Sequence, residues 1–160
     1  MEKTVYKFED FLTSVEPEHK YFFTKIHESL IQENYKTKIE SKAAGLFISY
    51  AHPKTKRSIL NFLSRKNGKL VRIYVDSCDK HADLLNALPE KMEKEIAKSG
   101  VCKRLTDPTT CNPKCMMGYD FSINGNHYKK CRYSCFTFLV DDESIPVITA
   151  FVENEMTGRN

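Results

Sequence analysis

The sequence lacks low-complexity runs, long apolar runs and an apolar N-terminal leader. Because low-complexity runs are absent and 29% of the residues are charged, we do not expect the chain to be disordered. The longest apolar runs are a few residues, far shorter than a membrane-spanning helix needs. The first residues contain no apolar stretch of the kind found in secretory signals. We therefore expect a cytoplasmic protein that makes no contact with a membrane.

The chain also lacks the short motifs of several common enzyme classes. No G-x-x-x-x-G-K-[ST], G-x-G-x-x-G, H-E-x-x-H or G-x-S-x-G sequence occurs, so the nucleotide triphosphatase, Rossmann, zincin and α/β-hydrolase classes lose their usual support. A cysteine nucleophile would need a histidine base, and the local candidate is His127 near Cys131 or Cys135. Nearness in sequence is weak evidence for a catalytic pair, so we predict no catalytic residue.

The chain is long and apolar enough to form one domain. Its 160 residues are 41% hydrophobic and include ten Phe and eight Tyr. Such a chain can build a core without disulfide bonds as staples. The net charge of +4 permits nucleic-acid binding but does not by itself imply it. We predict a single domain over residues 1–160.

The spacing of apolar residues changes along the chain from a helical period to a strand period. Apolar residues at a spacing of four predict a helix over residues 18–33. Alternating residues then predict four strands with short turns between them, at residues 38–42, 46–50, 58–65 and 69–75. Asn67-Gly68 predicts a type I′ hairpin turn between the last two, in which both residues have positive φ. This order predicts an antiparallel meander.

Helices and a second hairpin are predicted after the meander. Helical patterns cover residues 79–87 and 89–98, and a hairpin is predicted around Asn124-Gly125. Residues 136–140 are strand-like, and Ile145, Ile148 and Val152 lie on one face of a closing helix. The predicted fold class is α+β. Residues 1–100 form an antiparallel sheet with helices packed on it, and residues 101–160 form a cysteine-rich hairpin, a strand and the closing helix.

Five of the six cysteines fall within 34 residues, from Cys102 to Cys135. In a reducing compartment, clustered cysteines more often bind metal than form disulfides. Thiolates are preferred ligands of zinc, and a structural zinc site needs four ligands around one ion. The predicted zinc ligands are Cys102, Cys111, Cys115 and Cys131.

The choice between Cys131 and Cys135 depends on the backbone between them. In an extended strand four residues span about 13 Å, so both thiols cannot reach one ion. In a helix the two would share a face. Aromatic residues in this stretch favour extension, so Cys135 is expected to be a buried spare. Cys135 and His127 remain alternate ligands, and Cys78 is expected to pack as a small apolar residue.

Three arrangements besides a zinc site remain open for the cysteine cluster. The thiols can be buried without metal, or they can hold an iron–sulfur cluster or form a redox disulfide. Cationic side chains bracket the cluster and would offset the charge of four thiolates or contact phosphate. These cations are Lys103, Arg104, Lys129, Lys130 and Arg132.

The predicted meander carries basic and aromatic residues in alternation. Basic side chains can neutralise phosphates while aromatic rings stack on bases. The aromatic residues are Phe47, Tyr50, Phe62 and Tyr74, which a sheet also needs to pack against its helices. The candidate nucleic-acid contacts are Lys56, Arg57, Arg65, Lys66 and Arg72.

Three segments of the C-terminal third resemble a family of small uncharacterised cytosolic bacterial proteins. They are GVCKRL from Gly100, CNPKCMMGYDF from Cys111 and YKKCRYS from Tyr128. That family carries no assigned activity, so the resemblance implies only a bacterial, cytosolic setting. The N-terminal half is similar in layout to YdhG-like small α+β domains, one branch of which has been proposed as an iron chaperone. The first helix of this chain lacks the acidic ridge on which that role would depend.

These observations leave three hypotheses. The first is a non-enzymatic domain that binds a small molecule or a protein partner and is stabilised by a cysteine-bound zinc ion. The second is a nucleic-acid-binding module that uses the basic meander. The third is a thiol-dependent enzyme or redox protein that uses Cys131 or Cys135.

Overall fold

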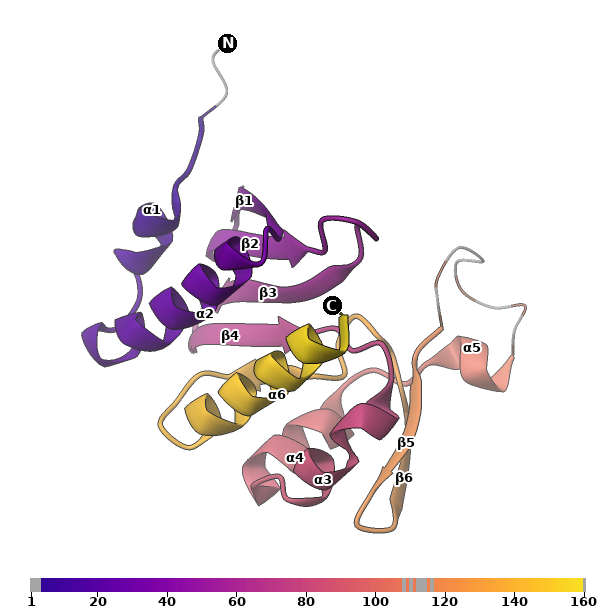
Figure 1. The fold of residues 1–160 in the computed structure, drawn as a ribbon. Helices are drawn as coiled ribbons and strands as arrows, with labels where there is room; N and C mark the ends of the chain where they lie inside the picture. Colours follow the sequence, from indigo (N-terminus) through magenta and orange to yellow (C-terminus); the bar gives the residue numbers. More distant parts are fainter. Residues whose placement is uncertain (1–3, 108, 110, 112–114, 116, 160) are drawn as a thin grey trace.

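The computed structural model describes residues 4–107, 109, 111, 115 and 117–159, and it has the predicted α+β architecture (Figure 1). The strands are β1 (Lys36–Lys42), β2 (Gly45–Ala51), β3 (Ser58–Arg65), β4 (Gly68–Ile73), β5 (Tyr119–Ile123), β6 (Asn126–Lys130) and β7 (Thr137–Leu139). The α-helices are α1 (Phe8–Leu12), α2 (Lys20–Gln32), α3 (Ala82–Asn86), α4 (Glu90–Lys98), α5 (Lys103–Thr106) and α6 (Ser144–Arg159), with 3-10 turns at Pro17–His19 and Cys78–His81. Five strands form an antiparallel sheet in the order β1-β2-β3-β4-β7, and β5 and β6 form a separate hairpin.

The first four strands form the predicted meander, but the turn between β3 and β4 differs from the prediction. Strand β4 already begins at Gly68, so the two turn residues are Lys66 and Asn67. Only Gly68 of the predicted pair has a positive φ, 132°, and the type I′ assignment is wrong. Asn124 and Gly125 between β5 and β6 both have positive φ, 47° and 86°, as a type I′ turn requires.

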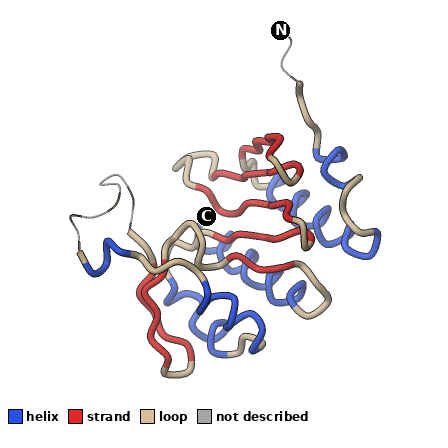
Figure 2. The backbone as a smooth tube through the Cα atoms, turned by 180° about the vertical axis from the view of Figure 1, so that it is seen from behind, coloured by secondary structure: helices blue, strands red, loops and turns tan. Residues whose placement is uncertain are grey.

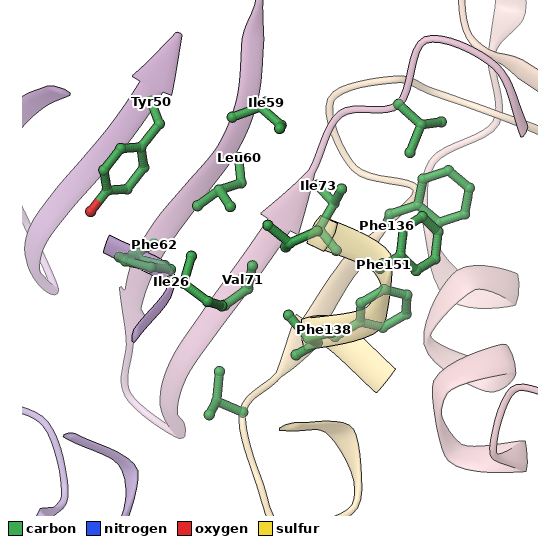
Figure 3. Close-up of a cluster of buried hydrophobic side chains, with 14 of the residues drawn as sticks. Ile26, Tyr50, Ile59, Leu60, Phe62, Val71, Ile73, Phe136, Phe138 and Phe151 are labelled. Atoms are coloured by element: carbon green, nitrogen blue, oxygen red, sulfur yellow. The ribbon is translucent and has the colours of Figure 1, made fainter. Parts of the chain in front are cut away.

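Helices α2 and α6 pack on one face of the five-stranded sheet (Figure 1). Helix α2 begins later than predicted because residues 17–19 form a 3-10 turn. In the inner strands every second residue points toward these helices, and those near the middle of the sheet have no exposed surface, whereas Ile39 and Leu46 toward the β1 edge are partly buried. Figure 3 shows this layer, which includes Tyr50, Leu60, Phe62, Val71, Ile73 and Phe138 from the sheet and Phe151 from α6.

The opposite face of the sheet is not covered by any helix of the described part, and the strands lie in front of the helices in the reverse view (Figure 2). A row of polar side chains crosses this face. The amide of Asn61 donates to the hydroxyl of Tyr74 (2.8 Å), and Nε of Arg72 donates to Oγ1 of Thr137 (3.0 Å). These polar groups are therefore satisfied by their neighbours within the sheet.

The two edge strands of the sheet, β1 and β7, differ in the groups that they present at the open edge. Strand β7 has only three residues, and the N–H of Leu139 donates to Oε2 of Glu95 on α4 (3.0 Å). Strand β1, at the other edge, carries Lys36, Lys38 and Lys42. One edge thus has its backbone donor bonded to a side chain, and the other carries three cations.

A carboxylate is buried where α6 meets the segment after β4. The Glu155 side chain is fully buried, and its Oε1 accepts a hydrogen bond from the backbone N–H of Asp76 (2.7 Å). Its Oε2 lies 3.3 Å from Nε2 of His81 and 3.2 Å from Nζ of Lys80, and Arg159 lies 3.5 Å from Oε1. Burial alone would raise the pKa of Glu155, but the hydrogen bonds and the two cations hold that pKa below its ordinary value.

Candidate metal-binding cavity

A cavity of about 390 Å³ opens beside the β5–β6 hairpin. Its walls come from residues 101–104, from residues 131–133 and from described residues of the segment that precedes β5. The four cysteines that were predicted as metal ligands all line it: Cys102, Cys111, Cys115 and Cys131. The fold therefore brings to one cavity side chains that lie up to 29 positions apart in the sequence.

Backbone pairing explains how the two ends of this segment meet. Val101 forms an antiparallel bridge with Lys130 on β6. The N–H of Cys102 donates to the carbonyl of Lys129 (3.0 Å), which continues the same pairing. Because Cys131 directly follows β6, this pairing places Cys102 and Cys131 on the same wall of the cavity.

Gly118 packs against Cys102 on the inner side of the cavity. Its backbone N–H donates to the Sγ of Cys102 (3.2 Å), the kind of supporting hydrogen bond that orients metal-binding side chains. A Cβ atom at Gly118 would lie 2.1 Å from the carbonyl oxygen of Lys130 and 2.7 Å from Cβ of Cys102. Only glycine fits between these two groups.

Substituting Gly118 by alanine should therefore lower the free energy of unfolding by about 1–3 kcal/mol, because backbone must move to admit the new methyl group. Chemical denaturation measures this change. Gly100→Ala is the matched control, since its new Cβ would meet Oγ of Ser134 at 3.3 Å, a side chain that can rotate, and Cβ of Cys131 at 3.8 Å, an ordinary contact. Equal losses in the two variants would contradict the tight packing of Gly118 on Cys102.

The stretch from Cys131 to Cys135 is a turn, and the predicted extension is wrong. The backbone N–H groups of Ser134 and Cys135 donate to the carbonyl of Cys131, at 3.1 and 2.9 Å. The pairing of the preceding residues with the 100–102 segment ends here, and the chain turns back toward the sheet. Cys135 points into the core with no exposed surface, whereas Cys131 lines the cavity. Cys135 is thus the buried residue that was expected, but for a different reason.

The two cysteines outside the cavity have little reactivity. Burial raises the pKa of Cys78 to about 12 and raises the pKa of Cys135 well above its ordinary value. Both thiols are therefore protonated at neutral pH, and the thiol form is a poor nucleophile and a poor metal ligand. Cys78 packs against the hydrophobic core, as predicted.

His127, the alternate ligand, lies elsewhere on the hairpin. Its imidazole is exposed and forms a hydrogen bond with the carboxylate of Asp120, across β5 and β6. His127 does not line the cavity. Cys102, the ligand that His127 was expected to replace if necessary, lines the cavity itself.

Three of the bracketing cations line the cavity. They are Lys103, Arg104 and Arg132, and Arg104 also donates to the backbone carbonyl of Cys115. Their positive charge can offset the negative charge of a site with four thiolates. Lys130 has another role, because its ammonium donates to backbone carbonyls at the end of α4, those of Ala97 (2.8 Å) and Ser99 (3.0 Å).

The sulfur atoms line one cavity without forming a compact cluster. Among the described residues, the only group of three metal-ligating side chains with donor atoms within 4.8 Å of one another is Glu16, Glu18 and His19. These belong to the start of the first 3-10 turn, where acidic residues are common for electrostatic reasons. Glu16 and Glu18 are exposed.

The candidate nucleic-acid contacts do not form one patch. Lys56 and Arg57 precede β3, whereas Arg65 and Lys66 lie at its other end, about 25 Å away along an extended strand. Arg72 bonds to its neighbour Thr137 on the uncovered face. The aromatic residues are divided as well: Tyr50 and Phe62 are fully buried under the helices, and Phe47 and Tyr74 lie on the other face.

The chain was also compared with family models, curated proteins and solved structures. None of them matches it. The resemblance of the C-terminal segments to small bacterial proteins therefore stays a prediction, as does the likeness to YdhG-like domains. No helix of the described part has the length and apolar composition needed to cross a bilayer.

Proposed function

We propose that this chain is a non-enzymatic binding domain for a small molecule or a protein partner, and that a zinc ion bound by four cysteines holds its C-terminal third together. The observation that carries the proposal is that the four cysteines chosen from the sequence line one cavity. The two remaining cysteines are packed in or against the core. The division between the two groups is what a four-thiolate site requires.

The surroundings of the cavity also suit a structural metal site. Cys102 accepts a backbone hydrogen bond from Gly118, and three cationic side chains line the same cavity. Such supporting contacts orient metal ligands and balance their charge. Cys111 and Cys115 follow α5 and precede β5, and neither belongs to a helix or strand of the described part. Zinc binding would bring their sulfur atoms closer to those of Cys102 and Cys131.

Zinc binding requires this adjustment. In a tetrahedral site with zinc–sulfur bonds of about 2.3 Å, the sulfur atoms are about 3.8 Å apart. Among the described residues, no three cysteine sulfur atoms lie within 4.8 Å of one another, so the four predicted ligands are farther apart than a zinc site requires. We therefore expect the sulfur atoms of Cys111 and Cys115 to lie closer to those of Cys102 and Cys131 when the ion is bound, which couples metal affinity to the stability of this part of the domain.

Metal analysis of the purified protein should find about one zinc per chain, and Cys115→Ser should lose it. The same variant should unfold more easily, by about 3 kcal/mol or more at zinc concentrations well above the dissociation constant, because bound metal stabilises only the folded state. Inductively coupled plasma mass spectrometry and chemical denaturation measure the two effects.

Cys78→Ser is the matched control, since Cys78 lies outside the cavity and should not change the zinc content. A protein without metal, in which one cysteine of the cavity is alkylated much faster than the others, would contradict the zinc site. That result would instead favour a reactive thiol. Unchanged metal content and unchanged stability in Cys115→Ser would also contradict it.

A further inference from the structure

A second cavity, of about 200 Å³, lies on the other side of the 131–134 turn, and we call it the arginine cavity. It is lined by Arg57, Ser58, Tyr74, Arg132, Tyr133 and Arg159. Three separate parts of the chain supply the arginines: the loop before β3, the 131–134 turn and the end of α6. None of the six lining residues is acidic.

The nearby carboxylates lie behind this lining and do not neutralise it completely. Asp76 pairs with Arg57 at 2.5 Å and lies 3.6 Å from Arg159. Glu155 lies 3.5 Å from Arg159 and is also shared with Lys80. The three arginines of the lining thus have two carboxylates behind them, one of which is shared with Lys80, and Arg132 makes no ion pair with any described residue.

Several donors around the arginine cavity are not used by the protein. Nε of Arg132 donates to the carbonyl of Met117 (3.0 Å), and Nη1 donates to the carbonyl of Val75 (3.0 Å) and the hydroxyl of Tyr119 (3.2 Å). Its Nη2 has no partner among the described residues. Arg57 pairs with Asp76 through Nη2 alone. The remaining N–H groups of Arg57 and Arg132 are available to a ligand with several oxygen acceptors. Arg159 contributes its charge, because its Nη1 and Nη2 already donate to the carbonyls of Arg57 (3.3 Å) and Tyr74 (3.0 Å).

We propose that the arginine cavity binds the phosphate group of a small phosphorylated ligand. A guanidinium group matches the oxygens of a phosphate through paired hydrogen bonds, and several arginines around one small cavity favour a doubly charged anion over a single carboxylate. Tyr133 is 54% exposed, and its ring centroid lies 6.0 Å from that of Tyr74. Tyr133 offers a surface on which a planar group attached to the phosphate stacks.

This site goes beyond the proposed zinc function and does not depend on it. Arg132 and Tyr133 line both cavities, but the contacts that hold Arg132 are made to Met117, Val75 and Tyr119 and not to the thiols. The phosphate site can therefore be present whether or not the metal proposal is correct. Titration of the metal-free and the zinc-loaded protein separates the two proposals.

The test is calorimetric titration at constant ionic strength with inorganic phosphate, a nucleoside monophosphate and the corresponding nucleoside. Phosphate should bind saturably, the monophosphate should bind more tightly than phosphate, and the nucleoside should not bind. Arg57→Gln should weaken binding of both phosphates about tenfold, since it removes a charge-assisted contact. Tyr133→Ala should weaken only the monophosphate, down to the affinity of inorganic phosphate.

Arg65→Gln is the matched control, because Arg65 ends the strand that Arg57 precedes and lies far from the cavity. Its affinities should be unchanged. Arg57→Lys keeps the positive charge but loses the paired N–H donors of the guanidinium group. Its affinity for phosphate should therefore fall between those of the wild type and Arg57→Gln. No saturable binding up to about 10 mM phosphate would overturn the proposal. Equal losses in Arg57→Gln and Arg65→Gln would overturn it too, because they would indicate non-specific attraction. Equal affinity for phosphate and the monophosphate would overturn the stacking contact.

Discussion

Glu155→Ala should lower the free energy of unfolding by about 3–5 kcal/mol, because it removes the buried carboxylate on which several cationic and polar groups converge. The variant leaves the buried side chain of His81 without its acceptor and removes one of the two carboxylates beside Arg159. The backbone N–H of Asp76 loses its hydrogen bond as well. Chemical denaturation near neutral pH measures the loss.

Glu153→Ala is the control on the same helix. Its side chain is exposed, and it makes no ion pair with a described residue, so the expected change is within about 0.5 kcal/mol. If both variants lose the same stability, the loss comes from the helix and not from the buried network.

The same network should give an acid dependence. The pKa of Glu155 is lower in the folded protein than the ordinary value near 4.5, so the folded state favours the ionised form. Its contribution to stability is therefore present above about pH 4.5 and is lost as the pH falls through the lowered folded pKa. Denaturation from pH 7 to pH 3 should show a smaller decline in Glu155→Gln than in the wild type. Parallel declines would exclude Glu155 as the source.

Phe62→Ala should cost about 3–5 kcal/mol, the range for removing a fully buried aromatic side chain. Its ring is 4.8 Å from that of Phe23, 5.7 Å from Phe11 and 5.4 Å from Tyr50, so it joins two helices to the sheet. The substitution leaves a void among rings that come from separate elements and cannot easily collapse. Thermal and chemical denaturation should both report the loss.

Phe47→Ala tests the assignment of the two faces. Phe47 lies beside Ile48 on β2 but points to the uncovered face, where it is half-buried and contacts Lys42. The expected loss is about 1 kcal/mol or less, because little apolar area leaves the core. A loss as large as that of Phe62→Ala would mean that the uncovered face is as important for packing as the helix-covered one.

Local patterns predicted most of the individual elements. The meander could be predicted because period-two alternation is a local property, and each of the four strands begins and ends within two residues of its predicted bounds. The closing helix could be predicted from Ile145, Ile148 and Val152 for the same reason. The turn at Lys66-Asn67 was mispredicted because the pairing register, and not the Asn-Gly pair, decides which residues form the turn.

Features that depend on long-range pairing were not predictable in the same way. The clustering of the cysteines predicted four ligands as a set. No local sequence pattern predicts the bridge between Val101 and Lys130, which brings the segment of Cys102 beside that of Cys131. The burial of Glu155 did have a local signal. Glu155 lies three residues after Val152 and seven after Ile148, on the apolar stripe of α6. A charged residue on an apolar stripe indicates a buried partner, which here is the group around His81.

The ends of the sheet bear on how the protein behaves at high concentration. An open strand edge can pair with the edge of another copy and so begin aggregation. Here β7 is short and its outward N–H is bonded to Glu95, which leaves one less free donor for an incoming strand. Strand β1 carries three lysines and one glutamate, Glu40, which pairs with Lys38 (3.0 Å) and Lys42 (3.4 Å), and its net positive charge disfavours pairing with the β1 strand of a second copy. A variant that combines Glu95→Ala with neutral residues at the three lysine positions would leave both edge strands open to pairing with other copies, so that sheets of successive molecules could join edge to edge.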